Sequence, residues 1–310
     1  DDLMIYRLAD DHYLVVVNAS NNDKNWAWVN AVREGTVMID PQNPARTVSI
    51  TDFVLRDLRA LSSGDDRRVD VALQGPKSKD MLIALGGSDA DVAKLNKLAW
   101  AGVMRGTFGG FDLIISRTGY TGERVAYEVF VHPAQAPALF KALVDLGTTP
   151  CGLAARDSLR TEAGLPLYGH ELAGPLGLSA GDAGFGSYVK IYKPFFIGKG
   201  AYITREMARS AVVVRFRLDN KGVRPPHQGD PLVDKKGRVV GIVTSCSIDS
   251  DGYQLGQAYV KLDSSAEGTS LGIFAGAEKL KPQQFGDVNL GGKVTVPDPV
   301  TIISRFPKKK

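Results

Sequence analysis

The change in pattern near residue 212 constrains the fold of this chain more than any other feature. Beyond this point the sequence consists of short β-rich runs separated by Gly, Pro and Asp. Closely spaced short strands with such turns are typical of a small antiparallel barrel, whose closure removes open sheet edges. We therefore expect a carboxy-terminal β-barrel, with strands that include residues 212–218, 239–245, 257–260 and 293–296.

Strand and helix patterns are mixed in the residues before this point. Alternating apolar residues predict a hairpin near the start of the chain, and Gly109-Gly110 predicts a second hairpin because glycine tolerates the positive φ of a two-residue turn. The expected strands are residues 3–8, 13–17, 69–73, 103–108, 111–116 and 127–131.

Helices are expected between these strands. The first is capped by Asn22 or Asp23 and would bury Trp26, Val29 and Val32. A second begins at Pro76, since proline suits the first helical position. The remaining helices follow near residues 92–98, 137–146 and 152–162.

Chain length and local composition suggest several domains. The 310 residues correspond to two or three domains at about 150 residues each. Residues 34–66 are rich in Pro, Gly, Asp and Arg and look like a linker. We predict a first segment over 1–66, a central α+β domain over 67–207 and the barrel over 208–310.

Composition excludes several functional classes. Apolar residues make up 44% and charged residues 23%, which is typical of a globular protein and argues against disorder. The net charge of +4 is spread along the chain apart from the run 308–310, so nucleic-acid binding is not expected. No apolar run approaches the roughly 18 residues of a membrane span.

Cysteine and histidine usage predicts no metal site. The two cysteines and four histidines lack metal-ligand spacing, which favours a reducing compartment, the cytoplasm or a mitochondrial matrix. The chain also opens without Met inside a predicted strand, so we expect its biological start to lie upstream.

Three features could carry chemistry, and each has an alternative structural explanation. Residues 116–123 place two glycines around Tyr120 after a strand, either as a simple turn or as a wall for a flat ligand. Arg156 and Arg160 share a helix face and need an anionic partner, from the protein or from a ligand. The Asp1-Asp2 pair could edge a strand or do acid/base work.

Read together and in order, these segments resemble the aminomethyltransferase (T-protein) family of the glycine cleavage system. The longest motifs are Arg-Thr-Gly-Tyr-Thr-Gly-Glu at 117–123, Cys-Gly-Leu-Ala-Ala-Arg-Asp-Ser-Leu-Arg at 151–160 and Glu-Ala-Gly-Leu-Pro-Leu-Tyr-Gly-His-Glu-Leu at 162–172. Shorter ones are Asp-Asp-Leu-Met-Ile-Tyr at 1–6, Val-Val-Asn-Ala at 16–19, Gln-Gly-Pro at 74–76, Phe-Ile-Gly-Lys at 196–199 and Gly-Ile-Val-Thr-Ser at 241–245. The resemblance covers nearly the whole chain.

The resemblance implies a cloverleaf-like, three-domain α+β fold that binds tetrahydrofolate in a central channel. Asp2 matches the family's catalytic aspartate, and Glu128 matches the acid that holds the pterin ring. Arg156 matches an arginine that binds folate or substrate. The residues that match the lining of the same channel are Tyr6, Asn18 and Tyr120.

The chemistry of that family suits these residue types. A carboxylate such as Glu128 can accept the two adjacent N–H groups of a pterin, and bonds of this kind contribute about 1.5 to 3 kcal/mol each. N5 of tetrahydrofolate would take a one-carbon unit from an aminomethyl group on the lipoyl arm of an H-protein-like carrier, with release of ammonia. We expect a buried Asp2 to stabilise the positive charge that develops.

Departures from the family pattern leave the one-carbon donor open. The loop before Glu128 is one residue longer than the family pattern, and residues 178–184 diverge from it. The alternatives are a related demethylase, or a sarcosine or dimethylglycine catabolic domain, with a small methyl donor. A non-catalytic folate-binding factor is disfavoured, since the Lys-Gly-Cys motif of that subgroup is absent near residues 197–200.

Overall fold

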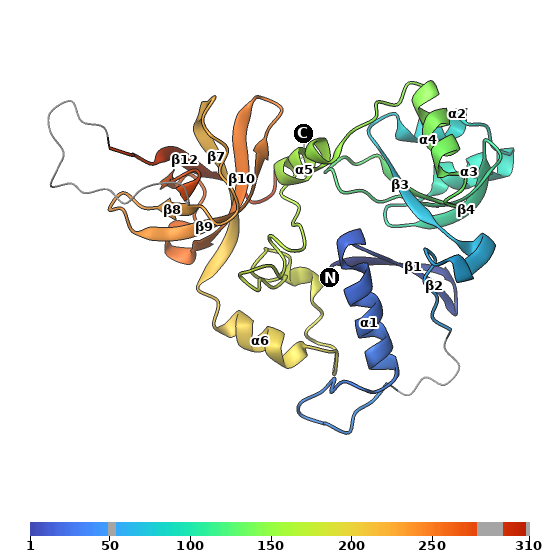
Figure 1. The fold of residues 1–310 in the computed structure, drawn as a ribbon, viewed down its shortest axis with the longest axis horizontal. Coiled ribbons are helices and arrows are strands. Elements are labelled where there is room, and N and C mark those ends of the chain that lie inside the picture. The colour runs from blue at the N-terminus through green and yellow to red at the C-terminus, as the bar shows by residue number, and fades with distance from the viewer. Residues whose placement is uncertain (49–53, 278–293, 308–310) are drawn as a thin grey trace. The chain divides into compact units, whose positions relative to one another are not determined.

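The computed structural model describes residues 1–48, 54–277 and 294–307. The chain forms two compact units, Asp1–Gly152 and Leu153–Lys310, which are described separately (Figure 1). This division is coarser than the three segments expected, and the three-domain division stays a prediction. The basic run 308–310 and the first residue of the expected strand 293–296 lie outside the described residues.

The first unit is built on a four-stranded antiparallel sheet. Its strand order is β3-β6-β5-β4, where β3 is Val69–Gln74, β6 Ala126–Val131, β5 Phe111–Ser116 and β4 Val103–Phe108. Gly109 and Gly110 join β4 to β5 with φ of 61° and 79°, the backbone that a tight hairpin turn requires. All four expected strands are confirmed.

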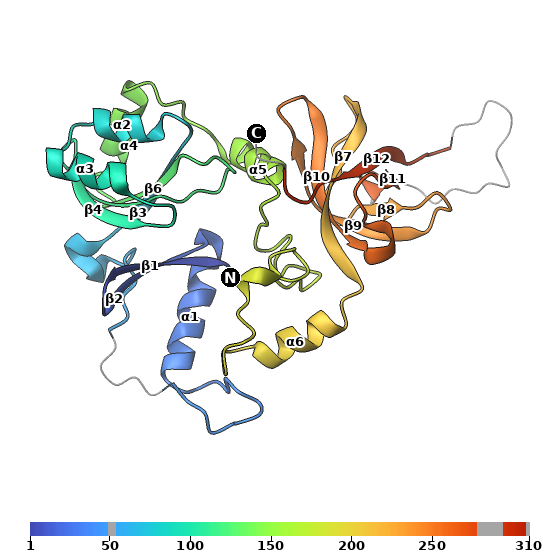
Figure 2. The same cartoon turned by 180° about the vertical axis from the view of Figure 1, so that it is seen from behind.

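Helices cover one face of this sheet and a hairpin covers the other (Figures 1 and 2). Leu113, Ile115 and Val129 point toward the helices and are fully buried. Because successive strand residues alternate in direction, Ile114 and Phe130 point the opposite way and pack against the hairpin. The covering elements are α2 (Ser78–Ala84), α3 (Asp89–Lys97) and α4 (Ala136–Asp145) on one face, and β1 (Leu3–Ala9) with β2 (His12–Val17) on the other.

Two helix expectations are wrong in detail. The helix expected at Pro76 begins at Ser78. Helix α1 (Asn22–Arg33) has Asn21 as its cap, one residue before the predicted cap, and contains no buried residue; Trp26 and Val29 are 39% and 40% exposed. Its principal neighbour among the described residues is the single-turn helix η1 (Ala19–Asn21), which is too small to cover an apolar face.

The second unit contains a closed six-stranded antiparallel barrel, which confirms the expected architecture. The order around the barrel is β10-β7-β12-β11-β8-β9. Its strands are β7 (Ala211–Lys221), β8 (Pro231–Val233), β9 (Val239–Ile248), β10 (Tyr253–Lys261), β11 (Ser270–Ile273) and β12 (Asp298–Ile303). Phe216, Val243 and Val260 are fully buried in its core.

The two shortest strands of the barrel were not predicted from the sequence. Strands β8 and β11 have three and four residues, too few for an alternating pattern to stand out. Residues 294–296 are not a strand, and β12 begins at Asp298, next to Pro299, a residue that weakens a strand signal.

Helices precede the barrel in this unit. They are α5 (Leu153–Glu162) and α6 (Lys199–Met207). The described residues also include the short 3-10 helices η2 (Leu61–Asp66, kinked at Gly64), η3 (Gly186–Tyr188) and η4 (Leu262–Ser264). Within the described residues, none of the helices combines the length and the apolar character needed to cross a membrane.

Candidate functional site

Glu128 is a charged residue on the face of the central sheet that packs against the β1–β2 hairpin. It lies on β6 two residues before Phe130, so both side chains point toward the β1–β2 hairpin. Its cross-strand neighbour on β5 is Ser116, the last residue of that strand. Strand pairing therefore brings a hydroxyl and a carboxylate together at one end of the sheet.

Three hydroxyl groups surround the Glu128 carboxylate. Thr118 Oγ1 donates to Glu128 Oε2 at 2.5 Å, and the Tyr6 hydroxyl donates to the same oxygen at 3.0 Å. Thr118 Oγ1 lies 2.7 Å from the Tyr6 hydroxyl and 2.7 Å from Ser116 Oγ. Tyr6, Ser116 and Thr118 are 2%, 0% and 5% exposed, so the cluster is shielded from water.

The two oxygens of Glu128 differ in their partners. Every hydrogen bond of this side chain within the described part of the chain goes to Oε2. Since Glu128 is only partly buried, Oε1 remains as an acceptor for a group from outside the protein. A carboxylate arranged in this way can hold a ligand that presents N–H or O–H donors.

Tyr6 keeps its proton throughout the physiological range. Burial raises the pKa of its phenol to about 12, against the opposing effect of hydrogen bonds with Ser116 and Thr118. The tyrosine is therefore a neutral hydrogen-bond donor to the cluster, and it joins the hairpin to the sheet.

The loop after Thr118 is held by Gln74 of β3. Gln74 Oε1 accepts from the Tyr120 backbone N–H at 3.1 Å and from Thr121 Oγ1 at 2.8 Å. A Cβ at Gly119 would lie 2.5 Å from Ala126 Cβ and 2.8 Å from Gln74 Oε1, so only glycine fits. Gln74 thereby fixes the backbone that presents Tyr120.

A second polar group in this unit contains the Asp pair. Asn18 Nδ2 donates to Asp2 Oδ1 at 2.7 Å and to Asp1 Oδ1 at 2.9 Å. Asp1 also accepts from the side chains of Asn21 and Asn25 at 2.9 and 2.5 Å. Asp2 is exposed, which corrects the expectation of a buried carboxylate.

The predicted site residues thus fall into two hydrogen-bonded pairs and two single residues. Tyr6 and Glu128 share a hydrogen bond, and Asp2 and Asn18 share another. Tyr120 follows the loop that Gln74 holds. Arg156 is exposed on α5 and belongs to the second unit.

Sequence reasoning missed Ser116, Thr118 and Gln74. Thr118 and Gln74 fall inside the motifs that carried the resemblance, but motif matching alone did not show their bonds. The available signal was positional, since a Ser-x-Thr pair at the end of a strand places both hydroxyls on one face.

Arg160, one turn after Arg156, has a structural role. Its guanidinium is 1% exposed and pairs with Glu171 at 2.9 Å and with Asp157 at 2.5 Å. Nη2 also donates to Ser245 of β9 at 2.9 Å. Arg160 therefore joins α5 to the barrel, and protein carboxylates supply its anionic partners.

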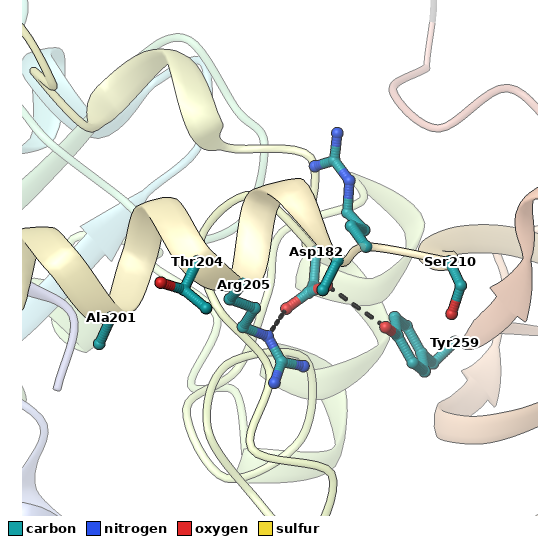
Figure 3. Close-up of a pocket in the computed structure, with 8 residues that line it drawn as sticks. Asp182, Ala201, Thr204, Arg205, Ser210 and Tyr259 are labelled. Atoms are coloured by element: carbon teal, nitrogen blue, oxygen red, sulfur yellow. Dashed lines mark hydrogen bonds and ion pairs between the residues drawn. The ribbon is translucent and has the colours of Figure 1, made fainter.

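The second unit has a cavity of about 500 Å³ beside α6 (Figure 3). The buried Asp182 accepts from Arg205 Nε, from the Ser179 backbone N–H at 2.8 Å and from the Tyr259 hydroxyl at 3.3 Å. Burial acts to raise the pKa of Asp182, but the bonds from Ser179 and Arg205 outweigh it and lower that pKa. The acid in this cavity is satisfied by the protein, unlike Glu128.

The comparisons with known proteins agree on one family. The family described as the GCVT N-terminal domain matches residues 1–193. An aminomethyltransferase of Halothermothrix orenii is 37% identical over 284 residues, which cover 88% of this chain and 69% of the relative. One from Streptomyces avermitilis is 37% identical over 283 residues, covering 87% and 67%.

A solved structure is similar in fold as well. The crystal structure of glycine cleavage system aminomethyltransferase T from Bartonella henselae matches with a TM-score of 0.71 and 25% identity. The match covers 98% of this chain and 71% of that one.

Proposed function

Because the chain belongs to the aminomethyltransferase family, we propose that it transfers an aminomethyl-derived one-carbon unit to N5 of tetrahydrofolate, with Glu128 as the residue that holds the pterin ring. The observation that carries this assignment is the unshared acceptor Glu128 Oε1 beside Oε2, which Thr118 holds and which competes with Thr118 Oγ1 for the single Tyr6 proton. When bound, tetrahydrofolate supplies the N5 acceptor for the one-carbon unit.

The residues around Glu128 fit the edge of a pterin. The 2-amino group and N3 of the ring present two parallel N–H donors, and a carboxylate is the protein group that accepts such a pair with both oxygens. Next to the acid, the buried rings of Tyr6 and Phe130, with centres 6.2 Å apart, pack the hairpin against the sheet and so fix the position of Glu128. Tyr120, on the loop held by Gln74, is the proposed wall of the same site.

Asp2 is the proposed catalytic residue. Positive charge develops at the transferred carbon, and a fixed carboxylate stabilises such charge. Asn18 restrains Asp2 through one oxygen, Oδ1, at 2.7 Å. Asp1 accepts side-chain bonds from three asparagines, so its role in this proposal is to fix the position of Asn18.

The proposed donor is an aminomethyl group on the lipoyl arm of a carrier protein, as in the glycine cleavage system. Arg156 is the proposed contact for an anionic part of folate or of the donor, because it is exposed on α5 while Arg160 is used internally. The proposed compartment is the cytoplasm, or the mitochondrial matrix in a eukaryote.

Isotope-traced turnover with Glu128→Gln tests the function. We expect the wild-type protein to form methylene-tetrahydrofolate from an aminomethyl-loaded lipoyl carrier. The glutamine variant should bind tetrahydrofolate at least about tenfold more weakly, since one charge-assisted acceptor is replaced by a neutral amide. Methyl-tetrahydrofolate formed only with a small methyl donor would assign the protein to the demethylase branch, and unchanged binding by the variant would remove Glu128 from the site.

Asp2→Ala tests the catalytic assignment. We expect kcat to fall by about 10²-fold or more while tetrahydrofolate affinity persists, because the residue acts on charge that develops during transfer. Asp1→Asn is the matched control, and its effect on kcat should be smaller. Equal turnover by Asp2→Ala and wild type would exclude Asp2 from the mechanism.

A further inference from the structure

Thr118 is the centre of the hydrogen bonds around Glu128. Its Oγ1 contacts the Ser116 hydroxyl at 2.7 Å, the Tyr6 hydroxyl at 2.7 Å and Glu128 Oε2 at 2.5 Å. A threonine hydroxyl has one proton to donate and two lone pairs to accept. Three partners therefore use its full capacity.

The ionised form of Glu128 fixes the direction of these bonds. A carboxylate can only accept, so Thr118 donates its single proton to Oε2. Ser116 must then donate to Thr118. Tyr6 has one proton and two acceptors within reach, Thr118 Oγ1 at 2.7 Å and Glu128 Oε2 at 3.0 Å.

The acceptor to which Tyr6 donates its proton determines how many lone pairs of the Glu128 carboxylate remain for a ligand. If Tyr6 donates to Glu128, both lone pairs of Oε2 are used and only Oε1 remains for a ligand. If Tyr6 donates to Thr118, Oε2 keeps one lone pair and the carboxylate can accept two parallel N–H groups, one on each oxygen. Thr118 makes the second arrangement possible because it has a lone pair for the Tyr6 proton.

We propose that Thr118 is a positioning residue for ligand selection: it orients Glu128 with its own proton and accepts the Tyr6 proton, so that the carboxylate selects ligands with two adjacent N–H donors. This inference rests on the proposed function, in which the ligand edge is that of a reduced pterin. Ser116 supports the arrangement by filling the other lone pair of Thr118. All of these side chains except Glu128 are at most 5% exposed, so water does not replace a missing partner readily.

Thr118→Val is the test, because valine has nearly the same shape and no hydroxyl. The probes are tetrahydrofolate and its 2-desamino-2-methyl analogue, which lacks one of the two donors. In the variant Tyr6 donates to Oε2 in place of Thr118, so the number of free lone pairs is unchanged but the carboxylate loses the 2.5 Å bond that orients it. We expect the variant to bind tetrahydrofolate about tenfold more weakly and to lose most of the preference for tetrahydrofolate over the analogue, because a carboxylate that is not held in one orientation does not present both oxygens to adjacent donors. Thr118→Ser retains the hydroxyl and should restore both the affinity and the preference.

Matched controls separate positioning from general damage. Thr107→Val makes the same change at an exposed position on β4 and should alter neither ligand affinity. Should Thr118→Val fail to fold, Thr118→Cys, which hydrogen-bonds only weakly, replaces it. The result that overturns the proposal is an equal loss of affinity for both ligands, or no loss for either.

The outcomes also distinguish this inference from the function it rests on. Normal binding by Thr118→Val with lost binding by Glu128→Gln leaves the proposed function intact and rejects the positioning role. Normal binding by both variants rejects the Glu128 site itself.

Discussion

Glu171 and Glu128 are both hydrogen-bonded glutamates, but the protein satisfies them to different extents. Glu171 is fully buried, and its Oε2 accepts from Arg160 Nη1 at 2.9 Å and from the Leu167 backbone N–H at 3.0 Å. Its Oε1 accepts from Thr244 Oγ1 at 2.5 Å. Glu128 has described partners on Oε2 alone and is partly exposed.

The difference separates a structural acid from a binding acid. A carboxylate with partners on both oxygens and an arginine beside it has no capacity for a ligand, and it stabilises the packing of its neighbours. A carboxylate with one oxygen left over, at a partly exposed position, is available for recognition. Removing each acid or its partners should therefore affect different properties.

Arg160→Met is expected to produce the largest effect, on stability. It leaves the buried Glu171 carboxylate without its cation, and breaking a buried pair costs about 3 to 5 kcal/mol. Hydrogen exchange of the β9 amides measures this loss in the second unit. Glu128→Gln should cost less than about 1 kcal/mol, measured by hydrogen exchange of the β6 amides in the first unit, since a partly exposed amide keeps most of the bonds.

The double variant Arg160→Met/Glu171→Leu sharpens this test. Replacing both charges by apolar groups removes the uncompensated carboxylate, so the variant should be more stable than Arg160→Met alone. A double variant that is as unstable as the sum of the single ones would mean that the pair itself, rather than the orphaned charge, sets the cost.

Tyr6, which donates to Glu128, should make the stability of the protein depend on pH. Its pKa is raised to about 12 in the folded protein, so between the unfolded value near 10 and this value the folded state binds more protons. Stability from Tyr6 is then fully present below pH 10 and is lost as the pH rises toward 12, by roughly 3 kcal/mol at most. We expect Tyr6→Phe to unfold with a shallower fall over this range in guanidinium titrations. An identical slope for the two proteins would show that the phenol does not ionise with unfolding.

The elements that the sequence predicted well are the ones with strong local signals. The β4–β5 hairpin follows from Gly109-Gly110 between alternating strands, and α5 follows from helical spacing. The short strands β8 and β11 form because neighbouring barrel strands pair with them, which residue patterns do not encode locally. The burial expected for α1 failed for a similar reason, because burial depends on a neighbour that the helix sequence does not specify.

The sequence was enough to select individual residues of the candidate site, but it did not show which of them contact one another. The resemblance selected Glu128 and Tyr6, while their hydrogen bond joins residues 122 positions apart. Thr118 was visible only as part of a glycine-rich turn. Its role depends on the β5–β6 register, which pairs Ser116 with Glu128. Long-range register is set by the packing of whole faces, so a linear motif does not reveal it.

Breaking a surface ion pair should change the free energy of unfolding least of all the substitutions considered. Lys141 and Asp145 on α4 are 2.6 Å apart, closer than Arg160 and Glu171, but their side chains are 74% and 59% exposed. The lysine precedes the aspartate by four residues, the less favourable order, and the aspartate lies at the carboxy-terminal end of the helix. We expect Lys141→Gln to change stability by less than about 0.5 kcal/mol.

Repeating the measurement at high salt tests whether the effect of Lys141→Gln on stability is electrostatic. Any difference between wild type and Lys141→Gln in hydrogen exchange of the α4 amides should vanish in 1 M salt, where the Debye length is only about 3 Å. The loss in Arg160→Met should persist in the same buffer, because salt does not screen a pair that water does not reach. If both differences disappeared together, burial would not be what separates Glu171 from the surface acids, and the distinction between structural and binding carboxylates would have to rest on hydrogen-bond count alone.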